Sequence, residues 1–159
     1  MDALTHPGGT QWERAVRVLS LDVGDRRVGV AVSDPLGLWA RPLTVITRRS
    51  RQEDYRAIAR LAREHEAARI VVGHPLSMDG QVGPQALRVE RYAAGLAEYL
   101  DIPVVLWDER LSTAEAERLL QESGETWRQY RGRIDAVAAA VILQSYLDAV
   151  EEREETVDG

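Results

Sequence analysis

The sequence predicts a single α/β domain with a mixed five-stranded sheet flanked by helices. Near the N-terminus, three short apolar runs follow one another closely, separated by turn residues, which indicates antiparallel strands. Beyond them, apolar runs alternate with helical stripes, which is typical of βαβ units with parallel strands. The 159 residues suit one domain. We expect a flexible segment over 1–15, the folded domain over 16–150 and an acidic, disordered tail over 151–159.

The first three strands are expected in hairpin order, at Val18–Val23, Val28–Ser33 and Pro42–Thr47. A turn over 24–27 joins the first two. Because side chains alternate along a strand, Asp22 lies on the opposite face of the first strand from Leu21. This arrangement places one carboxylate at the end of an otherwise apolar strand.

The helices are predicted from their N-terminal signals. Ser50 and Ser112 each begin a capping box, and the second one predicts a short helix that ends near Glu122. Pro84 suits the first turn of a further helix. The remaining strands are expected at Arg69–Gly73 and Pro103–Trp107. The apolar stripe of the last helix is expected to comprise Ile134, Val137, Ala138, Val141, Ile142 and Tyr146.

The composition excludes several classes of site. The chain has no cysteine, which rules out disulfides and thiolate metal sites and fits a cytoplasmic location. No apolar run is long enough to cross a bilayer. The net charge of −6 first argues against a nucleic-acid partner, but residues 151–159 hold five acids against one arginine. All 20 basic residues are arginines, and their local clusters permit a nucleic-acid partner.

Three acids stand at comparable positions in three separate elements. Asp22 lies at the end of the first strand, Glu109 follows the fifth strand, and Asp135 lies at the head of the last helix. An unpaired carboxylate is costly to bury, so such positions favour a cation partner. Each acid also has a simpler explanation: a turn contact for Asp22, an arginine partner for Glu109, and the helix dipole for Asp135.

Oxygen ligands of this kind suit Mg²⁺ or Mn²⁺, and two such ions about 4 Å apart assist phosphodiester hydrolysis. The hypothesis is a two-metal nuclease in which Asp22 is shared between the ions. Asp108 and Glu109 point to opposite faces if the strand is regular, so only one can face Asp22. We favour Glu109, because Asp108 can form a salt bridge with Arg110.

An ordered set of motifs supports the acidic pattern: Asp22-Val23-Gly24 with Arg26–Ala31, Ala40–Leu43, Ile70–Gly73 with Pro75-Leu76 and Met78–Gly80, Asp108–Thr113, and Ile134-Asp135 with Ala138-Ala139 and Ile142-Leu143. The set spans about 18–147 and resembles the YqgF family, which is related to the RuvC resolvases and described as Holliday-junction resolvases or pre-16S rRNA nucleases. The resemblance implies an RNase H-like fold and metal-dependent cleavage, with Asp22, Glu109 and Asp135 as catalytic ligands.

Nucleic-acid contacts are expected from arginines and one aromatic residue near these acids. The candidates are Arg26, Arg27, Arg41, Arg110, Trp127, Arg128, Arg131 and Arg133. Arginine binds phosphate bidentately, and aromatic rings stack on bases. Solvated turn positions and local packing of Trp127 explain the same residues equally well. For His74, which follows the fourth strand, a hydrogen-bonding role in the loop is favoured over a phosphate contact.

These inferences lead to a hydrolase that cleaves nucleic acid with two Mg²⁺ or Mn²⁺ ions as cofactor; RNA is favoured as the substrate, and the choice between RNA and DNA stays open. The leading hypothesis is processing of the 5′ end of the 16S rRNA precursor, with ribosomal precursor particles as partners. Holliday-junction resolution is the alternative and requires a dimer. A non-catalytic binder of nucleic acid or ribosomes is a further alternative. Monomer or homodimer, and endonuclease or exonuclease, stay open.

Overall fold

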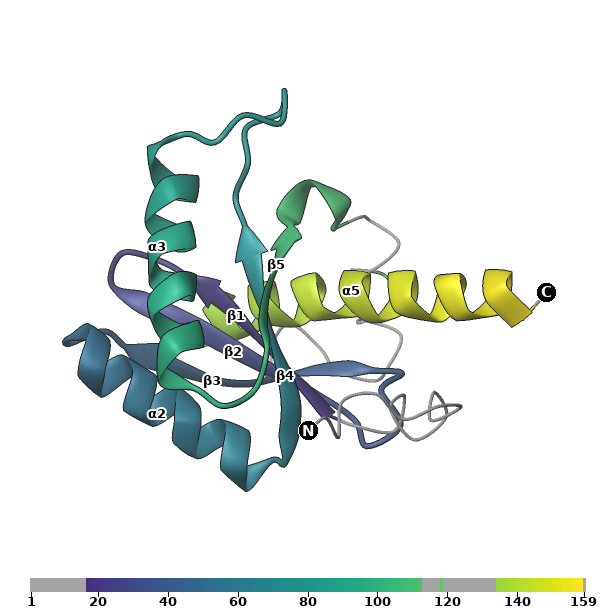
Figure 1. Cartoon of the computed structure of the whole chain (residues 1–159), viewed down its shortest axis with the longest axis horizontal. Coiled ribbons are helices and arrows are strands. Elements are labelled where there is room, and N and C mark those ends of the chain that lie inside the picture. Colours follow the sequence, from purple (N-terminus) through teal and green to yellow (C-terminus); the bar gives the residue numbers. More distant parts are fainter. Residues whose placement is uncertain (1–16, 113–117, 119–133, 159) are drawn as a thin grey trace.

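The computed structural model describes residues 17–112, 118 and 134–158. Its strands are β1 (Arg17–Val23), β2 (Arg27–Ser33), β3 (Ala40–Thr47), β4 (Ala67–His74) and β5 (Val104–Asp108). Its helices are α2 (Arg51–Glu64), α3 (Pro84–Tyr99), the 3-10 turn η1 (Glu109–Leu111) and α5 (Ile134–Asp158). The strands form one sheet in the order β3-β2-β1-β4-β5, so the predicted mixed sheet is confirmed (Figure 1).

Strand direction decides which chain segments meet. Strands β1, β2 and β3 pair antiparallel, whereas β4 pairs parallel with both β1 and β5. The carboxyl ends of β1, β4 and β5 therefore lie at the same edge of the sheet. Asp22 near the end of β1 and Glu109 just after β5 consequently come to that edge, with β4 between their strands.

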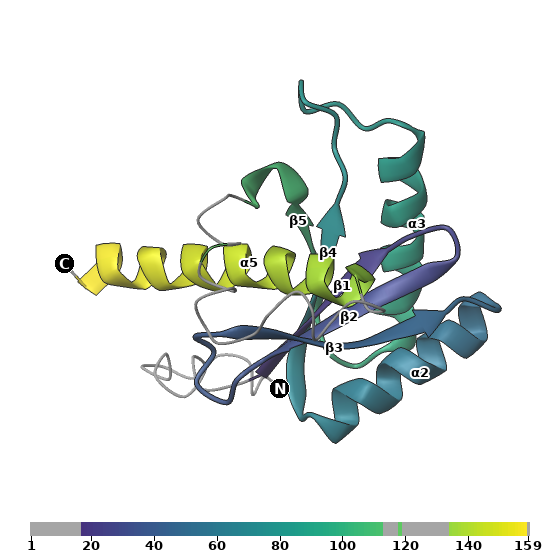
Figure 2. The same ribbon diagram turned by 180° about the vertical axis from the view of Figure 1, so that it is seen from behind.

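Helices cover both faces of the sheet. Figures 1 and 2 show α2 and α3 on one face and α5 crossing the other. The first core contains Leu19 and Leu21 with the buried faces of α2 and α3, and the second contains Val18 and Val71 with α5. The alternation predicted along β1 is thereby confirmed, and it places the Asp22 side of the strand toward α5.

The helix signals before α2 and α3 also hold. Ser50 caps α2, because its hydroxyl accepts a hydrogen bond from the Glu53 backbone N–H over 3.1 Å. Pro84 is the first residue of α3. The apolar side chains on one face of α2 are buried: Tyr55, Ile58, Ala59 and Ala62.

Helix α5 differs from the prediction at both ends. Ile134 is 66 % exposed, and Ala138 and Val141 are only half-buried, whereas Ala139 and Ala140 are buried. Because alanine side chains are small, the helix can approach the sheet closely on the side that carries Ala139 and Ala140, and this side faces the core. At the other end the helix continues to Asp158, where we expected a disordered tail over 151–159. Glutamate and arginine are good helix formers, and extending an existing helix requires no new nucleus.

Two expected segments, 1–15 and most of the short helix that follows Ser112, lie outside the described residues. In the part of the chain that the structure describes, no helix has the length and apolar character required to span a membrane.

Candidate active site

The three predicted acids meet at one edge of the sheet. Asp22 is the penultimate residue of β1, Glu109 opens η1 directly after β5, and Asp135 is the second residue of α5. Asp22 lies close enough to both other acids to interact with them electrostatically. The charge of Asp135 raises the pKa of Asp22, and the charge of Asp22 raises the pKa of Glu109. The parallel pairing of β1, β4 and β5 and the packing of α5 against the sheet thus bring together Asp22, Glu109 and Asp135.

The Asp22 carboxyl is half-buried between the sheet and α5. Burial, with a further contribution from the negative charge of Asp135, raises its pKa to about 6. No hydrogen bond or ion pair to the Asp22 carboxylate is found among the described residues. Within the described part of the chain, this carboxylate lacks the partner that usually compensates a half-buried charge.

Glu109 faces Asp22, and Asp108 is directed elsewhere. Burial, followed by the charges of Asp22 and Asp108, raises the pKa of Glu109 to about 7. Hydrogen bonds from Arg110, whose Nη2 lies 2.7 Å from Asp108 Oδ2, lower the pKa of Asp108. Asp108 is thus paired with Arg110, and Glu109 opens the turn η1, which ends the strand alternation between the two residues.

Asp135 is held in place by an arginine of the neighbouring strand. Arg27 Nε donates to Asp135 Oδ2 over 2.9 Å, and both side chains remain partly exposed. Arg27 thus has a carboxylate partner where the sequence suggested a phosphate. An exposed pair of this kind contributes little to stability, so the arginine can exchange the carboxylate for another anion at small cost.

Two glycines that the sequence did not single out make this assembly sterically feasible. Gly29 is the β2 partner of Asp22, and a Cβ atom there would lie 1.9 Å from the backbone oxygen of Asp135. A Cβ atom on Gly73 of β4 would lie 3.1 Å from Cγ of Glu109. The available signal was the position of each glycine inside a strand, which often marks a close approach of another chain segment.

The other predicted contacts divide into three groups. Arg26 is exposed in the turn after Asp22, and Arg110 is occupied by Asp108. Arg41 is level with Val32 and lies two strands from β1, so it is not part of the acidic cluster. The remaining candidates, Trp127, Arg128, Arg131 and Arg133, lie outside the described residues. His74 is the last residue of β4, and its Nε2 lies 2.8 Å from Oε2 of Glu90 in α3, so its hydrogen bond is to a helix and not within the loop as predicted.

A shallow groove runs beside Glu109 along the exposed start of α5. It has a volume of about 270 Å³ and is lined by Glu109, Ser112, Ile134, Val137, Ala138, Val141 and Ile142. Ser112 Oγ is buried there without a hydrogen-bond partner among the described residues. Of the predicted stripe residues of α5, Val137, Ile142 and Tyr146 are buried in the second core as expected, whereas Ile134 is exposed beside the acidic site.

The raised pKa values predict how stability depends on pH. For an acid whose folded pKa exceeds its unfolded value, the stabilising contribution is present below the unfolded pKa and disappears as pH rises through the folded pKa. Because the pKa of Glu109 is raised to about 7, we expect the free energy of unfolding in chelator to fall between pH 4 and pH 7. Glu109→Gln should flatten that fall by on the order of 2 kcal/mol. Urea unfolding at several pH values measures it.

The control for this experiment is Glu64→Gln, which removes an exposed acid at the end of α2. Its unfolding free energy should follow the wild-type pH profile. A Glu109→Gln profile that is parallel to wild type across the whole range would contradict the raised pKa of Glu109.

Comparison with known proteins adds a family to this geometry. The family model described as "RuvX: Holliday junction resolvase" matches residues 16–149. A protein of Syntrophus aciditrophicus (strain SB) named "Putative pre-16S rRNA nuclease" is 48% identical over 135 residues, which cover 85% of this chain and 90% of that protein. A protein of Halothermothrix orenii with the same name is 47% identical over 133 residues, or 84% of this chain and 95% of that protein.

Solved structures are similar in fold at low sequence identity. Thermus thermophilus RuvC in complex with a Holliday junction substrate superposes with a TM-score of 0.53 at 17% identity, covering 86% of this chain and 96% of that one. The fowlpox virus resolvase with its Holliday junction DNA superposes with a TM-score of 0.51 at 12% identity, covering 85% and 99%. The expected RNase H-like fold is confirmed by these superpositions.

Proposed function

Because this chain belongs to the RuvX family, we propose that it is a nuclease that hydrolyses phosphodiester bonds in the precursor of 16S rRNA and processes its 5′ end. The observation that carries the proposal is the meeting of Asp22, Glu109 and Asp135 at one sheet edge. Relatives that match this chain over nearly their whole length bear the name of such a nuclease. The activity is thus a cleavage reaction at a cluster of carboxylates.

The donor set fits divalent cations such as Mg²⁺ or Mn²⁺. All three side chains offer oxygen atoms, and the raised pKa values of Asp22 and Glu109 reflect a concentration of negative charge that a cation would relieve. Within the described residues, no three acidic or histidine side chains form a group that could hold one metal ion together. Asp22 instead has one acid on either side, which suits a carboxylate shared between two ions.

In this proposal Asp22 is the shared ligand, and Glu109 and Asp135 each complete one of the two sites. Bound cations would stabilise charge on the phosphoryl group and lower the pKa of the attacking water. The chain's own residues supply position. Arg27 pairs with the Asp135 carboxylate, and Arg110 pairs with Asp108, so that Glu109 is the acid of this segment left to act beside Asp22.

A second candidate function is resolution of four-way DNA junctions. The description of the matching family model and the fold shared with two junction-binding resolvases favour it. Resolution needs two active sites that cut two strands, so it requires a homodimer in solution. Processing of a single RNA strand has no such requirement.

The test is a cleavage assay with both substrates. Labelled 16S rRNA precursor and a labelled four-way DNA junction are each incubated with the protein in Mg²⁺, Mn²⁺ or chelator. We expect metal-dependent cuts near the 5′ end of the mature rRNA sequence and intact junctions. Symmetrical junction cuts by a dimer would instead assign resolution.

A non-catalytic binder is the remaining alternative. Tight binding of both substrates without any metal-dependent cutting would overturn the nuclease proposal and leave binding as the function. Sedimentation of the protein alone and with each substrate, measured in the same buffers, decides between monomer and homodimer.

A further inference from the structure

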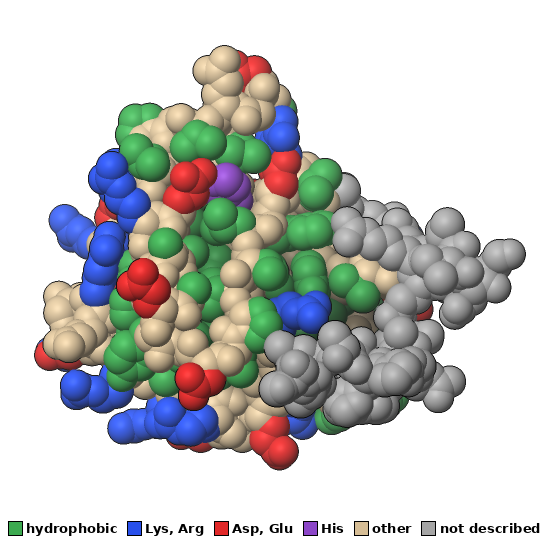
Figure 3. Space-filling model, in the orientation of Figure 1, with side chains coloured by type: hydrophobic (Ala, Val, Ile, Leu, Met, Phe, Trp, Pro, Cys, Tyr) green, Lys and Arg blue, Asp and Glu red, His purple; other side chains and the backbone are tan. Residues whose placement is uncertain are grey.

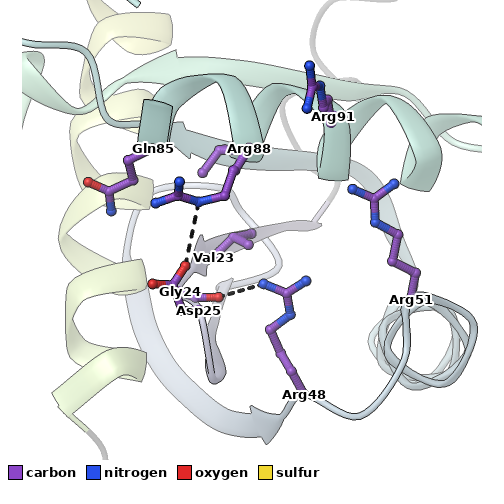
Figure 4. Close-up of a pocket in the computed structure, with 9 residues that line it drawn as sticks. Val23, Gly24, Asp25, Arg48, Arg51, Gln85, Arg88 and Arg91 are labelled. Carbon is purple, nitrogen blue, oxygen red and sulfur yellow. Dashed lines mark hydrogen bonds and ion pairs between the residues drawn. The ribbon is translucent and has the colours of Figure 1, made fainter. Parts of the chain in front are cut away.

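A pocket lined by arginines lies on the opposite face of the sheet from the three acids. It is enclosed by the turn after β1, the start of α2 and the first half of α3 (Figure 4). Its lining comprises Val23, Gly24, Asp25, Arg48, Arg51, Gln85, Arg88, Val89 and Arg91. Four of these nine residues are arginines and one is acidic, although the chain as a whole carries a net charge of −6.

Arg48 is fixed in the wall of the pocket by three contacts. Its Nη1 donates to the Gly24 backbone oxygen over 2.8 Å, and its Nε lies 3.4 Å from Oδ2 of the buried Asp54. Its guanidinium also lies over the Tyr92 ring, 4.7 Å from the centroid. The side chain is only 26 % exposed. This arginine is therefore held in one orientation before any ligand arrives.

The other arginines surround the same space with few protein partners. Arg51 extends from α2 toward α3, and Arg88 reaches over the β1–β2 turn from α3 (Figure 4). Arg88 Nε lies 3.7 Å from Asp25 Oδ1, a long ion pair, and both side chains are largely exposed. Arg51 and Arg91 form no ion pair with any carboxylate in the described part of the chain. Figure 3 shows arginine side chains gathered along this α3 and α2 border of the molecule.

The shape and charge of the pocket select a class of ligand. Its volume is about 280 Å³, near the lower end of the range for small-molecule sites. Guanidinium groups bind phosphate through paired N–H donors, and the weak Arg88–Asp25 pair can give way to such an anion. The lining offers little apolar surface for a larger organic ligand, with Val23 and Val89 as its only aliphatic members.

The position of the pocket relates it to the acidic site. Val23 and Gly24, which line it, directly follow Asp22 in the chain, so both sites lie at the same edge of the sheet. A nucleic-acid strand that crosses this edge over the turn at 24–27 would pass from the carboxylates to the arginines. The exposed Arg26 lies in that turn.

We propose that this pocket binds a phosphate group of the substrate strand at a position away from the scissile bond. The inference rests on the proposed nuclease function and deepens it, because it assigns a second anchoring point for the strand. A free phosphate ion would bind the same arginines, and the experiment distinguishes it from a phosphate of the strand. Arg88 and Arg91 were not expected from the sequence to contact nucleic acid, whereas Arg48 and Arg51 belong to a basic cluster that the sequence shows.

The test compares two double variants with equal charge change. Arg51→Gln/Arg88→Gln alters the pocket, whereas Arg56→Gln/Arg60→Gln alters exposed arginines of α2 that do not line it. Binding of a long single-stranded RNA is measured in chelator, where no cutting is expected, at several salt concentrations. We expect the pocket variant to bind about tenfold more weakly, with a salt slope shallower by about one. The control double variant should change less than about twofold.

Two further arms strengthen the design. Asp25→Asn removes the competing carboxylate and should tighten binding of the same RNA. A dinucleotide, which is too short to reach both sites, should bind wild type much more weakly than the long RNA does. Thermal unfolding of each variant checks that the fold is retained.

Other outcomes overturn the proposal. An equal loss of RNA affinity in both double variants would mean that the RNA is attracted by the overall positive charge of this surface and not by the pocket. Inorganic phosphate or pyrophosphate that binds wild type but not the pocket variant, while RNA binding is unchanged, would assign a free phosphate ligand and refute the strand contact. Because binding is measured without cutting, a pocket effect in a protein that cuts nothing would refute the nuclease function alone, whereas normal cutting with no pocket effect would refute the pocket alone.

Discussion

Replacing Asp22 by Asn is expected to lower the rate of metal-dependent cleavage on the order of 10³-fold or more. Asn keeps the size and one oxygen of the side chain but removes the negative charge that two cations would share. Because Asp22 lies between Glu109 and Asp135, its loss affects both proposed ion sites together, whereas loss of either outer acid affects one. The measurement is single-turnover cleavage of the RNA precursor in Mg²⁺ and in Mn²⁺.

The same substitution is expected to leave the metal-free protein at least as stable as wild type at neutral pH. Burial and the charge of Asp135 raise the pKa of Asp22 to about 6, so the ionised carboxylate opposes folding above that pH. Asp101→Asn is the matched control, because Asp101 is exposed between α3 and β5 at the far end of the sheet. It should cleave at the wild-type rate. Wild-type cleavage by Asp22→Asn would refute the proposed role of Asp22.

The secondary structure was largely predictable because its signals are local. The alternation along β1, the Ser50 cap of α2 and Pro84 at the start of α3 each depend on a few neighbouring residues. The stripe of α5 was predicted less well, since Ile134 is exposed. Periodicity identifies a helix but does not decide which of its sides faces the sheet, and here small alanines allow the closer approach.

The acidic cluster depended on long-range information that one sequence contains only indirectly. Asp22, Glu109 and Asp135 could each be explained by a local contact, and only the ordered motifs supported all three together. Their proximity follows from the parallel register of β1, β4 and β5, in which Leu21 pairs with Val72 and His74 with Asp108. No local pattern fixes such a register.

The arginine pocket could not be predicted from the sequence, although Arg48 and Arg51 were visible as part of a basic cluster. Arg88 and Arg91 are distant in the chain and join them only because α2 and α3 lie on the same face of the sheet. The fixed orientation of Arg48 depends on Asp54 and Tyr92, whose roles become apparent only in the folded chain. Charge clusters in a sequence therefore indicate candidate surfaces but not which of them converge.

Replacing Gly29 by Ala is expected to impair both folding and cleavage strongly. The added Cβ atom would lie 1.9 Å from the Asp135 backbone oxygen and 2.2 Å from its carbonyl carbon. Both contacts are with backbone, so the start of α5 must move by more than an ångström, which should cost roughly 3 kcal/mol of stability. Displacing Asp135 from Asp22 by this amount should lower cleavage about 10²-fold in protein that remains folded. Urea unfolding and single-turnover cleavage measure the two effects.

Two alanine variants separate this steric effect from the general cost of replacing glycine. Gly83→Ala is the control, because a Cβ atom there has no neighbour within 4 Å and should cost no more than about 1 kcal/mol. Gly73→Ala is the intermediate case, since its Cβ would meet only side chains, Ile142 Cδ1 at 2.6 Å and Glu109 Cγ at 3.1 Å. Its stability should fall less than that of Gly29→Ala while cleavage still drops, because Glu109 is pushed aside. Equal behaviour of Gly29→Ala and Gly83→Ala would show that α5 does not rest on β2 at Gly29, and the acids would then have to be assembled in another way.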